Sequence, residues 1–244
     1  MKTFGADLRA VLVPGADVRQ GPLPPLLLIM TVVTGLVDSF SYLKLGHVFV
    51  ANSTGNILFI GFALAHVPGF SIAESSLALG ATLVGAFAGG KLCSAFANRR
   101  DRILGLSASI EAILTAIAVL LALVASIPVH GVYRTGFVAV LGVAMGVQNA
   151  AARKIAVPDL TTTVLTMTIT GIGADSVLAG GPGSRPGRRL VAIASMLIGA
   201  VIGALLVLHT ALCAPLITAF SLMLVVAVWA TMAGRSRGAW TTGP

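Results

Sequence analysis

The sequence predicts an all-α polytopic membrane protein with six transmembrane helices, two interrupted or re-entrant segments and two inverted repeats. Composition supports the membrane class first. Of the 244 residues, 57% are hydrophobic and 10% are charged, and the mean hydropathy is +0.98. An average soluble domain carries about 25% charged residues. The chain therefore has too little polar surface to cover a soluble globule.

Apolar segments of membrane length follow one another along nearly the whole chain. About 20 apolar residues suffice to cross a bilayer. Eight segments meet this requirement: Pro24–Leu43, Val48–Ala65, Glu74–Ala97, Ile103–Ser126, Val132–Ala151, Leu160–Leu178, Leu190–Leu208 and Ala211–Met232. The second and sixth are rich in Asn, Ser and Thr, which is unusual for a helix that faces lipid. Backbone can leave helical geometry at membrane depth where protein or a water-filled cavity surrounds it.

The positions of Lys and Arg distinguish eight crossings from six, because these residues favour the cytoplasmic side. With eight crossings and a cytoplasmic N-terminus, nine lie inside and six outside; Lys91, within a segment, is left out. If the second and sixth segments enter and leave on one side, thirteen lie inside and only Lys44 and Arg134 outside. This favours six crossings and two cytoplasmic termini in a bacterial inner membrane. The net charge of +8 is thereby explained by topology, and no nucleic-acid partner is expected.

An internal repeat is visible in three matched stretches. Gly35-Leu-Val-Asp38 matches Gly146-Val-Gln-Asn149, Thr54-Gly55 matches Thr170-Gly171, and residues 83–89 match residues 197–203. We therefore expect a cytoplasmic N-terminal arm (1–22), a first repeat (23–128), a second repeat (129–233) and a cytoplasmic tail (234–244). Three crossings in each repeat invert the second relative to the first. Inverted repeats with discontinuous segments indicate a solute path near the bilayer midplane.

Polar residues within the apolar segments are the candidates for substrate or ion binding. A carboxylate at the centre of a transmembrane helix costs about 3 kcal/mol or more, so Asp38 is the first candidate. Alternatively, Asp38 is a structural partner of Asn149 or of hydroxyl groups across the pseudo-symmetry axis, and the threonines form hydrogen bonds between helices. The full set of candidates is Asp38, Asn52, Thr54, Asn56, Gln148, Asn149, Thr163, Thr166, Thr170 and Asp175.

Other ionisable residues suggest no catalytic or metal site. Glu111 follows the cluster of Arg99, Asp101 and Arg102, and we expect an ion pair there. The four histidines fall at the outer ends of segments without the spacing of metal ligands. We expect neither a cofactor nor a metal, and no motif of a membrane enzyme is present. The glycine pairs at 85 and 89 and at 199 and 203 are expected to pack helices closely.

Two stretches resemble a known family. Residues 35–56, Gly-Leu-Val-Asp38 through Asn52-Ser-Thr-Gly-Asn56, are similar to the YoaK-like family of bacterial multi-pass membrane proteins. Residues 146–171, with Gln148-Asn149, Pro158-Asp159 and Thr170-Gly171, resemble its second characteristic stretch. The resemblance covers essentially the whole chain and departs at Ser53, where a bulkier residue like Met is expected. The family has no known function, so the resemblance implies a membrane location and no catalytic residues.

The expected function is transport of a small polar solute or ion by alternating access between the two repeats. A passive channel, a membrane-embedded solute sensor and a membrane enzyme are the alternatives. The lipid bilayer and the solute are the expected partners, and the sequence is compatible with a homo-oligomer. It contains no ATP-binding loop of the Gly-x-x-x-x-Gly-Lys type.

Overall fold

Six helices in the described part of the chain have the length and apolar composition needed to cross a membrane. The computed structural model describes residues 4–125, 127–163, 165–181, 183–236 and 238–242. The six helices are α2 (Leu23–Lys44), α4 (Ile72–Ala95), α5 (Arg100–Val124), α6 (Gly131–Ile155), α8 (Pro186–His209) and α9 (Ala214–Gly234). Large apolar side chains such as Leu83, Phe87 and Leu197 are exposed on them and contact lipid in the bilayer. The predicted all-α polytopic membrane protein is confirmed.

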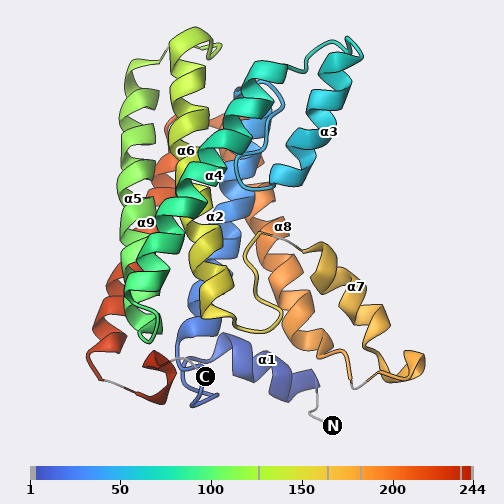
Figure 1. Ribbon diagram of the computed structural model, residues 1–244, viewed down its shortest axis with the longest axis vertical. Helices are drawn as coiled ribbons and strands as arrows, with labels where there is room; N and C mark the ends of the chain where they lie inside the picture. The colour runs from blue at the N-terminus through green and yellow to red at the C-terminus, as the bar shows by residue number, and fades with distance from the viewer. Residues whose placement is uncertain (1–3, 126, 164, 182, 237, 243–244) are drawn as a thin grey trace.

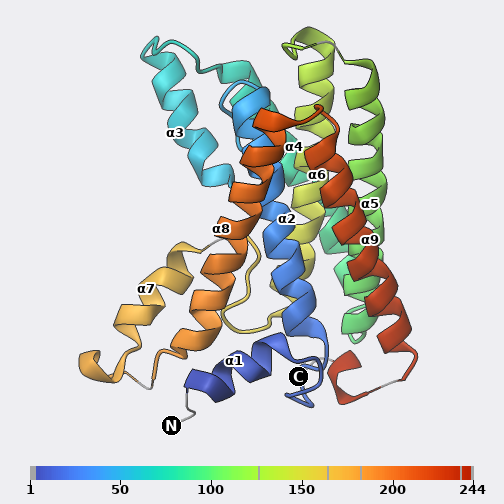
Figure 2. The same cartoon turned by 180° about the vertical axis from the view of Figure 1, so that it is seen from behind.

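Two helices are too short to span. The helices α3 (Ser53–Leu64) and α7 (Thr166–Ala174) extend roughly 18 and 14 Å, against a hydrocarbon core of about 30 Å. After α2 the chain turns back toward the middle of the molecule, and α3 returns to the same end (Figure 1). The loop after α6 and helix α7 do the same at the opposite end (Figures 1 and 2). The two polar segments are therefore interrupted, as predicted.

The helical parts of these segments are shorter than the apolar runs that contain them. Residues 45–52 form a loop before α3 begins at Ser53, and a second loop separates α6 from α7. In the second loop Ala156, Asp159 and Thr162 have φ values of 52°, 64° and 62°. This left-handed conformation is unfavourable for non-glycine residues and interrupts helical geometry.

The described segments nearest the two chain ends lie at the same end of the molecule as α7 (Figures 1 and 2). The N-terminal arm forms a short helix, α1 (Phe4–Leu12), which was not predicted. It packs on the first turn of α8, where a Cβ on Gly187 would lie 3.1 Å from the Phe4 carbonyl oxygen. Near the C-terminus Trp240, in the short 3-10 helix η2 (Ala239–Thr241), covers Gly21.

Glycines hold two pairs of spanning helices in backbone contact. A Cβ on Gly85 of α4 would lie 2.1 Å from the carbonyl oxygen of Val143 on α6, and a Cβ on Gly199 of α8 would lie 2.0 Å from that of Val32 on α2. Gly89 and Gly203 make the next contacts in the same two pairs. Each pair joins one helix of residues 23–128, here called the first half, to one of residues 129–233, the second half. The predicted packing role of these glycines is confirmed.

Candidate functional site

A polar cluster lies buried among the spanning helices. Its members are Thr34 on α2, Glu111 on α5, Gln148 on α6 and Thr162 in the loop before α7. Their exposed fractions are 0, 0, 0 and 1%. We call these four residues the central cluster. It draws two residues from each half, and one of them from an interrupted segment.

The Gln148 amide connects the members of the central cluster. When its nitrogen is oriented toward the carboxylate, Nε2 donates to Glu111 Oε1 at 2.8 Å and to Oε2 at 3.1 Å. The amide oxygen then accepts hydrogen bonds from Thr34 Oγ1 at 2.8 Å and Thr162 Oγ1 at 3.1 Å. One amide therefore joins an acidic side chain to α2 and to an interrupted segment.

Glu111 is the residue that sequence reasoning placed wrongly. The ion pair near that end of α5 joins Arg99 Nη2 to Asp101 Oδ2 at 2.7 Å, and Glu111 lies ten residues further along the helix. Ten residues correspond to about 15 Å of helix. Glu111 is therefore too far from Arg99 to form an ion pair with it. The ion pairs of the described residues join Arg99, Arg134 and Arg189 to other carboxylates, so Glu111 has no cation partner among them.

A signal for Glu111 was present in the sequence. Ser107, Glu111 and Thr115 recur every four residues, which places them on one face of a helix. All three are buried. A polar stripe in a transmembrane helix normally faces the protein interior, so the pattern predicts an inward carboxylate.

Asp38 binds the loop that precedes α3. Its Oδ1 accepts hydrogen bonds from the backbone nitrogens of Val50 at 3.1 Å and Ala51 at 2.8 Å, and its Oδ2 accepts one from the side-chain amide of Asn52. Asp38 as a whole residue is 4% exposed. Each of these bonds goes to its own half of the chain, and none goes to Asn149.

Asn56 fixes the same loop from the first turn of α3. Its Oδ1 accepts a hydrogen bond from the Phe49 backbone nitrogen at 3.0 Å, and its Nδ2 donates to the Phe49 carbonyl. Beside it, Gly55 leaves room for the Phe49 ring, because a Cβ there would lie 2.7 Å from Phe49 Cδ2. Asp38 and Asn56 together hold a non-helical backbone inside the protein by pairing its polar groups.

The second half repeats one of these contacts. Thr163 donates a hydrogen bond to Asn149 Oδ1, and the two residues are fourteen positions apart, as are Asp38 and Asn52. In both halves a polar side chain on the first spanning helix thus binds a residue of the following interrupted segment.

An ion-pair network stabilises α7 at the end that carries the termini. Arg189 on α8 places Nε 2.8 Å from Asp159 Oδ1 and Nη2 2.6 Å from Asp175 Oδ2. Its guanidinium lies on Gly171 of α7, where a Cβ would be 2.4 Å from Nη1. Asp175 therefore belongs to a structural network at the end of α7.

The ten predicted site residues do not form a single ring. Gln148 belongs to the central cluster. Asp38, Asn52 and Asn56 hold the first loop, Asn149 and Thr163 pair in the second half, and Asp175 binds Arg189. The remaining three, Thr54, Thr166 and Thr170, are exposed on the short helices.

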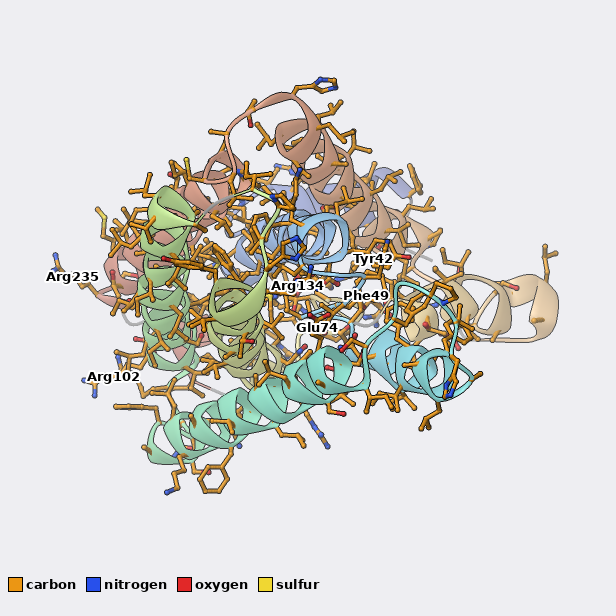
Figure 3. The ribbon with its side chains drawn as sticks, turned by 90° about the horizontal axis from the view of Figure 1, so that it is seen from above. Tyr42, Phe49, Glu74, Arg102, Arg134 and Arg235 are labelled. Atoms are coloured by element: carbon orange, nitrogen blue, oxygen red, sulfur yellow. The ribbon has the colours of Figure 1, made fainter. Side chains whose placement is uncertain are left out.

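A polar contact between helices or with the N-terminal arm lies at each end of the molecule. At the α3 end, Arg134 Nη1 on α6 lies 2.7 Å from Glu74 Oε1 on α4. Figure 3 shows both side chains near the centre of this end, with Tyr42 beside Phe49. At the opposite end, Arg188 Nη2 on α8 donates to Gln20 Oε1 of the N-terminal arm. The central cluster lies in the helix bundle that these two contacts bracket.

No group of three or more His, Cys, Asp and Glu side chains suited to a metal ion occurs among the described residues. The expectation that the protein uses no metal remains a prediction. The two cysteines are free, and Cys93 is buried against α6, with its Sγ 3.7 Å from the Ala150 carbonyl oxygen.

Comparison with known proteins identifies a relative and a family. A model of the family described as "Protein of unknown function (DUF1275)" matches residues 26–229. The UPF0700 transmembrane protein YoaK of Bacillus subtilis (strain 168) is 31% identical over 156 residues, which are 62% of this chain and 65% of that protein. The chain thus covers less than two thirds of that relative's length. No solved structure matches.

Proposed function

The chain belongs to the DUF1275 family of multi-pass membrane proteins, whose function is unknown, and we propose that it transports a small polar solute or ion by alternating access. The central cluster is the proposed binding site. The observation that carries the proposal is the position of Glu111, a fully buried carboxyl group of the first half that contacts Gln148 of the second half. Ionisable residues inside the membrane are costly and mark pathways for ions, protons and substrates.

The repeated contacts between helices support an inverted architecture. Val32 and Val143 are 111 residues apart, as are Gly35 and Gly146, and Gly85 and Gly199 are 114 apart. These equivalent residues make equivalent contacts, α4 against α6 and α2 against α8. The short helices of the two halves lie at opposite ends (Figure 1). Inverted repeats with interrupted segments are a common construction of secondary transporters.

Alternating access requires an opening at each end that can close. The Arg134–Glu74 pair links the halves at the α3 end, and the Arg188–Gln20 contact links the second half to the N-terminal arm at the other end. Both occur at the first turns of equivalent helices. We propose that these contacts open in turn as one half rocks against the other, which exposes the central cluster to one side at a time.

Asp38 has a positioning role in this proposal. Both of its oxygens are engaged by residues 50–52, so it holds the interrupted segment rather than a solute. From the distribution of Lys and Arg we propose that both termini and α7 lie on the cytoplasmic side of a bacterial membrane, with α3 on the outer side.

Flux into proteoliposomes tests the transport function. The purified protein is assayed with radiolabelled amino acids, sugars and organic acids, with and without gradients of Na⁺ and H⁺. We expect saturable uptake of at least one compound. Thr34→Val should reduce the uptake about tenfold. The substitution removes the hydrogen bond between Thr34 and Gln148, and the loss of one hydrogen bond of about 1.4 kcal/mol corresponds to a tenfold change.

Thr31→Val is the matched control. Thr31 is also buried on α2, but its hydroxyl donates only to the Leu27 carbonyl oxygen of its own helix, at 2.8 Å. Uptake should be preserved in this variant. Flux that does not saturate and ignores both substitutions would indicate a channel. Binding without flux would indicate a sensor, and turnover of a lipid without flux would indicate an enzyme.

A further inference from the structure

We propose that Glu111 binds an exchangeable proton and that the Gln148 amide rotates according to whether this proton is present. The central cluster would then be a proton-binding site, and the proton would be the coupling ion of transport. The coupling role rests on the proposed function. The binding of the proton and the amide rotation do not, since they depend only on the geometry of the described residues.

The surroundings of Glu111 leave Gln148 as its principal polar partner. Helix α9 contributes no Asp, Glu, Lys, Arg, His or Tyr between residues 214 and 234, and η2 contributes none. On α4, Glu74 pairs with Arg134, Lys91 lies 4.7 Å from the Phe87 ring centre and Cys93 faces α6.

The titratable groups of the other neighbouring elements are also accounted for. Arg153 and Lys154 are in the last turn of α6, and Tyr133 is in its first turn, beside Arg134. On α2, Asp38 lies one turn from Thr34 with its oxygens bound to the loop; Tyr42 and Lys44 are near the helix end. In the second loop Asp159 binds Arg189. A proton on Glu111 is therefore sensed mainly through Gln148.

Two hydrogen-bond arrangements fit the same heavy-atom positions. With Glu111 ionised, Gln148 Nε2 faces the carboxylate and its oxygen accepts from Thr34 and Thr162. With Glu111 protonated, the carboxyl O–H donates to the Gln148 oxygen instead. Gln148 Nε2 then donates to Thr34 Oγ1 at 2.8 Å, and the Thr34 hydroxyl donates to the Met30 carbonyl oxygen at 3.1 Å. In both arrangements the Gln148 amide, the Glu111 carboxyl group and the Thr34 hydroxyl have a partner.

Conversion between the two arrangements needs only small movements. When the proton leaves Glu111, the Gln148 side-chain amide rotates so that its nitrogen and oxygen exchange places. The Thr34 hydroxyl then donates to the Gln148 oxygen instead of the Met30 carbonyl oxygen. The Thr162 hydroxyl donates to the amide oxygen in the ionised arrangement. Because Thr34 lies on α2 and Thr162 in an interrupted segment, protonation changes the bonds that connect two elements of different halves. This is the kind of local change that can bias a two-state structure.

The amino-acid composition permits a direct measurement. The chain contains two glutamates, Glu74 and Glu111, and two glutamines, Gln20 and Gln148. Cell-free synthesis with ¹³C-labelled glutamate and ¹⁵N-labelled glutamine, followed by NMR in lipid nanodiscs, therefore reports on few groups. The Glu74→Gln variant leaves Glu111 as the one labelled glutamate side chain. Gln20→Ala, made separately in the wild-type chain, leaves Gln148 as the one labelled glutamine side chain.

We expect the Glu111 carboxyl resonance to change between acid and carboxylate forms as the pH is varied. The Gln148 side-chain resonances should shift with the same midpoint, and Glu111→Gln should abolish that shift. A Glu111 resonance that stays in one form over the whole pH range in which the protein is folded would overturn the proposal. So would a Gln148 amide that does not respond at the Glu111 midpoint.

The transport assay separates this inference from the proposed function. A normal NMR titration without solute uptake would retain the proton site and remove transport. Uptake that is indifferent to a pH gradient, together with a normal titration, would retain both the transporter and the proton site but remove the proton as coupling ion.

Discussion

Replacement of Asp38 by Ala and by Asn distinguishes a positioning role from a role for its charge. In Asp38→Ala the backbone nitrogens of Val50 and Ala51 lose their acceptor, Oδ1. Both residues are buried, and an unpaired buried donor costs about 1 to 3 kcal/mol. The two losses together should lower the free energy of unfolding by about 2 to 6 kcal/mol.

Asp38→Asn should behave differently. Its side-chain oxygen can accept the same two backbone hydrogen bonds, and the Asn52 amide can turn its oxygen toward the new NH₂ group. We expect a change of about 1 kcal/mol or less and preserved uptake. The second half already has an asparagine, Asn149, at the equivalent position, bound to Thr163.

Denaturant titration in bicelles measures the free energy of unfolding, and proteoliposome flux measures activity. The positioning role is refuted if Asp38→Asn is as stable as the wild type but inactive, because the charge itself would then be needed. It is also refuted if Asp38→Ala unfolds at the same denaturant concentration as the wild type, since the hydrogen bonds to the loop would then contribute nothing.

The remaining predictions concern packing and topology. Gly85→Ala should separate α4 from α6 and destabilise the protein by about 1 to 3 kcal/mol or more. Gly80→Ala on the same helix, with nothing within 4 Å of the added Cβ, should be neutral or stabilising by up to about 1 kcal/mol. Equal effects of the two substitutions in an unfolding titration would contradict the close packing of α4 on α6. Single cysteines at Lys44 and Pro68, in a background without the two native cysteines, should react with an impermeant reagent from the same side of the membrane, and one at Ser184 from the other. Labelling of Lys44 and Pro68 positions from opposite sides would show that the segment between them crosses.

The number of crossings could be predicted because charge and hydropathy act over whole segments. Thirteen basic residues on one side in the six-crossing arrangement, against nine with eight crossings, required no knowledge of side-chain contacts. The helix boundaries at Ser53 and Thr166 could not be predicted in this way. They depend on hydrogen bonds such as those from Asp38 to residues 50–52, which join positions at least twelve residues apart.

The candidate site was predicted less well, because residue type alone does not reveal which groups are already occupied. Asp38 and Asp175 have the chemistry of binding residues, but their oxygens bind a loop and Arg189. Gln148 was identified from the repeat. Glu111 was assigned to a cluster nearby in sequence, although the length of α5 carries it about 15 Å from that cluster. The meeting of Thr34 with Thr162 depends on how α2 packs against the second loop, which no local pattern encodes.

The two buried carboxyl groups, Asp38 and Glu111, differ in the nature of their partners. Asp38 accepts from backbone N–H groups, which can only donate, so its bound loop requires an acceptor at all times. Glu111 faces a side-chain amide, which can present either a donor or an acceptor after rotation. A change in the protonation of Glu111 is passed through Gln148 to α2 and to the second loop, whereas the hydrogen bonds of Asp38 stay within the first half. A proton can therefore enter and leave at Glu111 while Asp38 keeps the interrupted segment in place, and this division of roles is what a proton-coupled transporter needs.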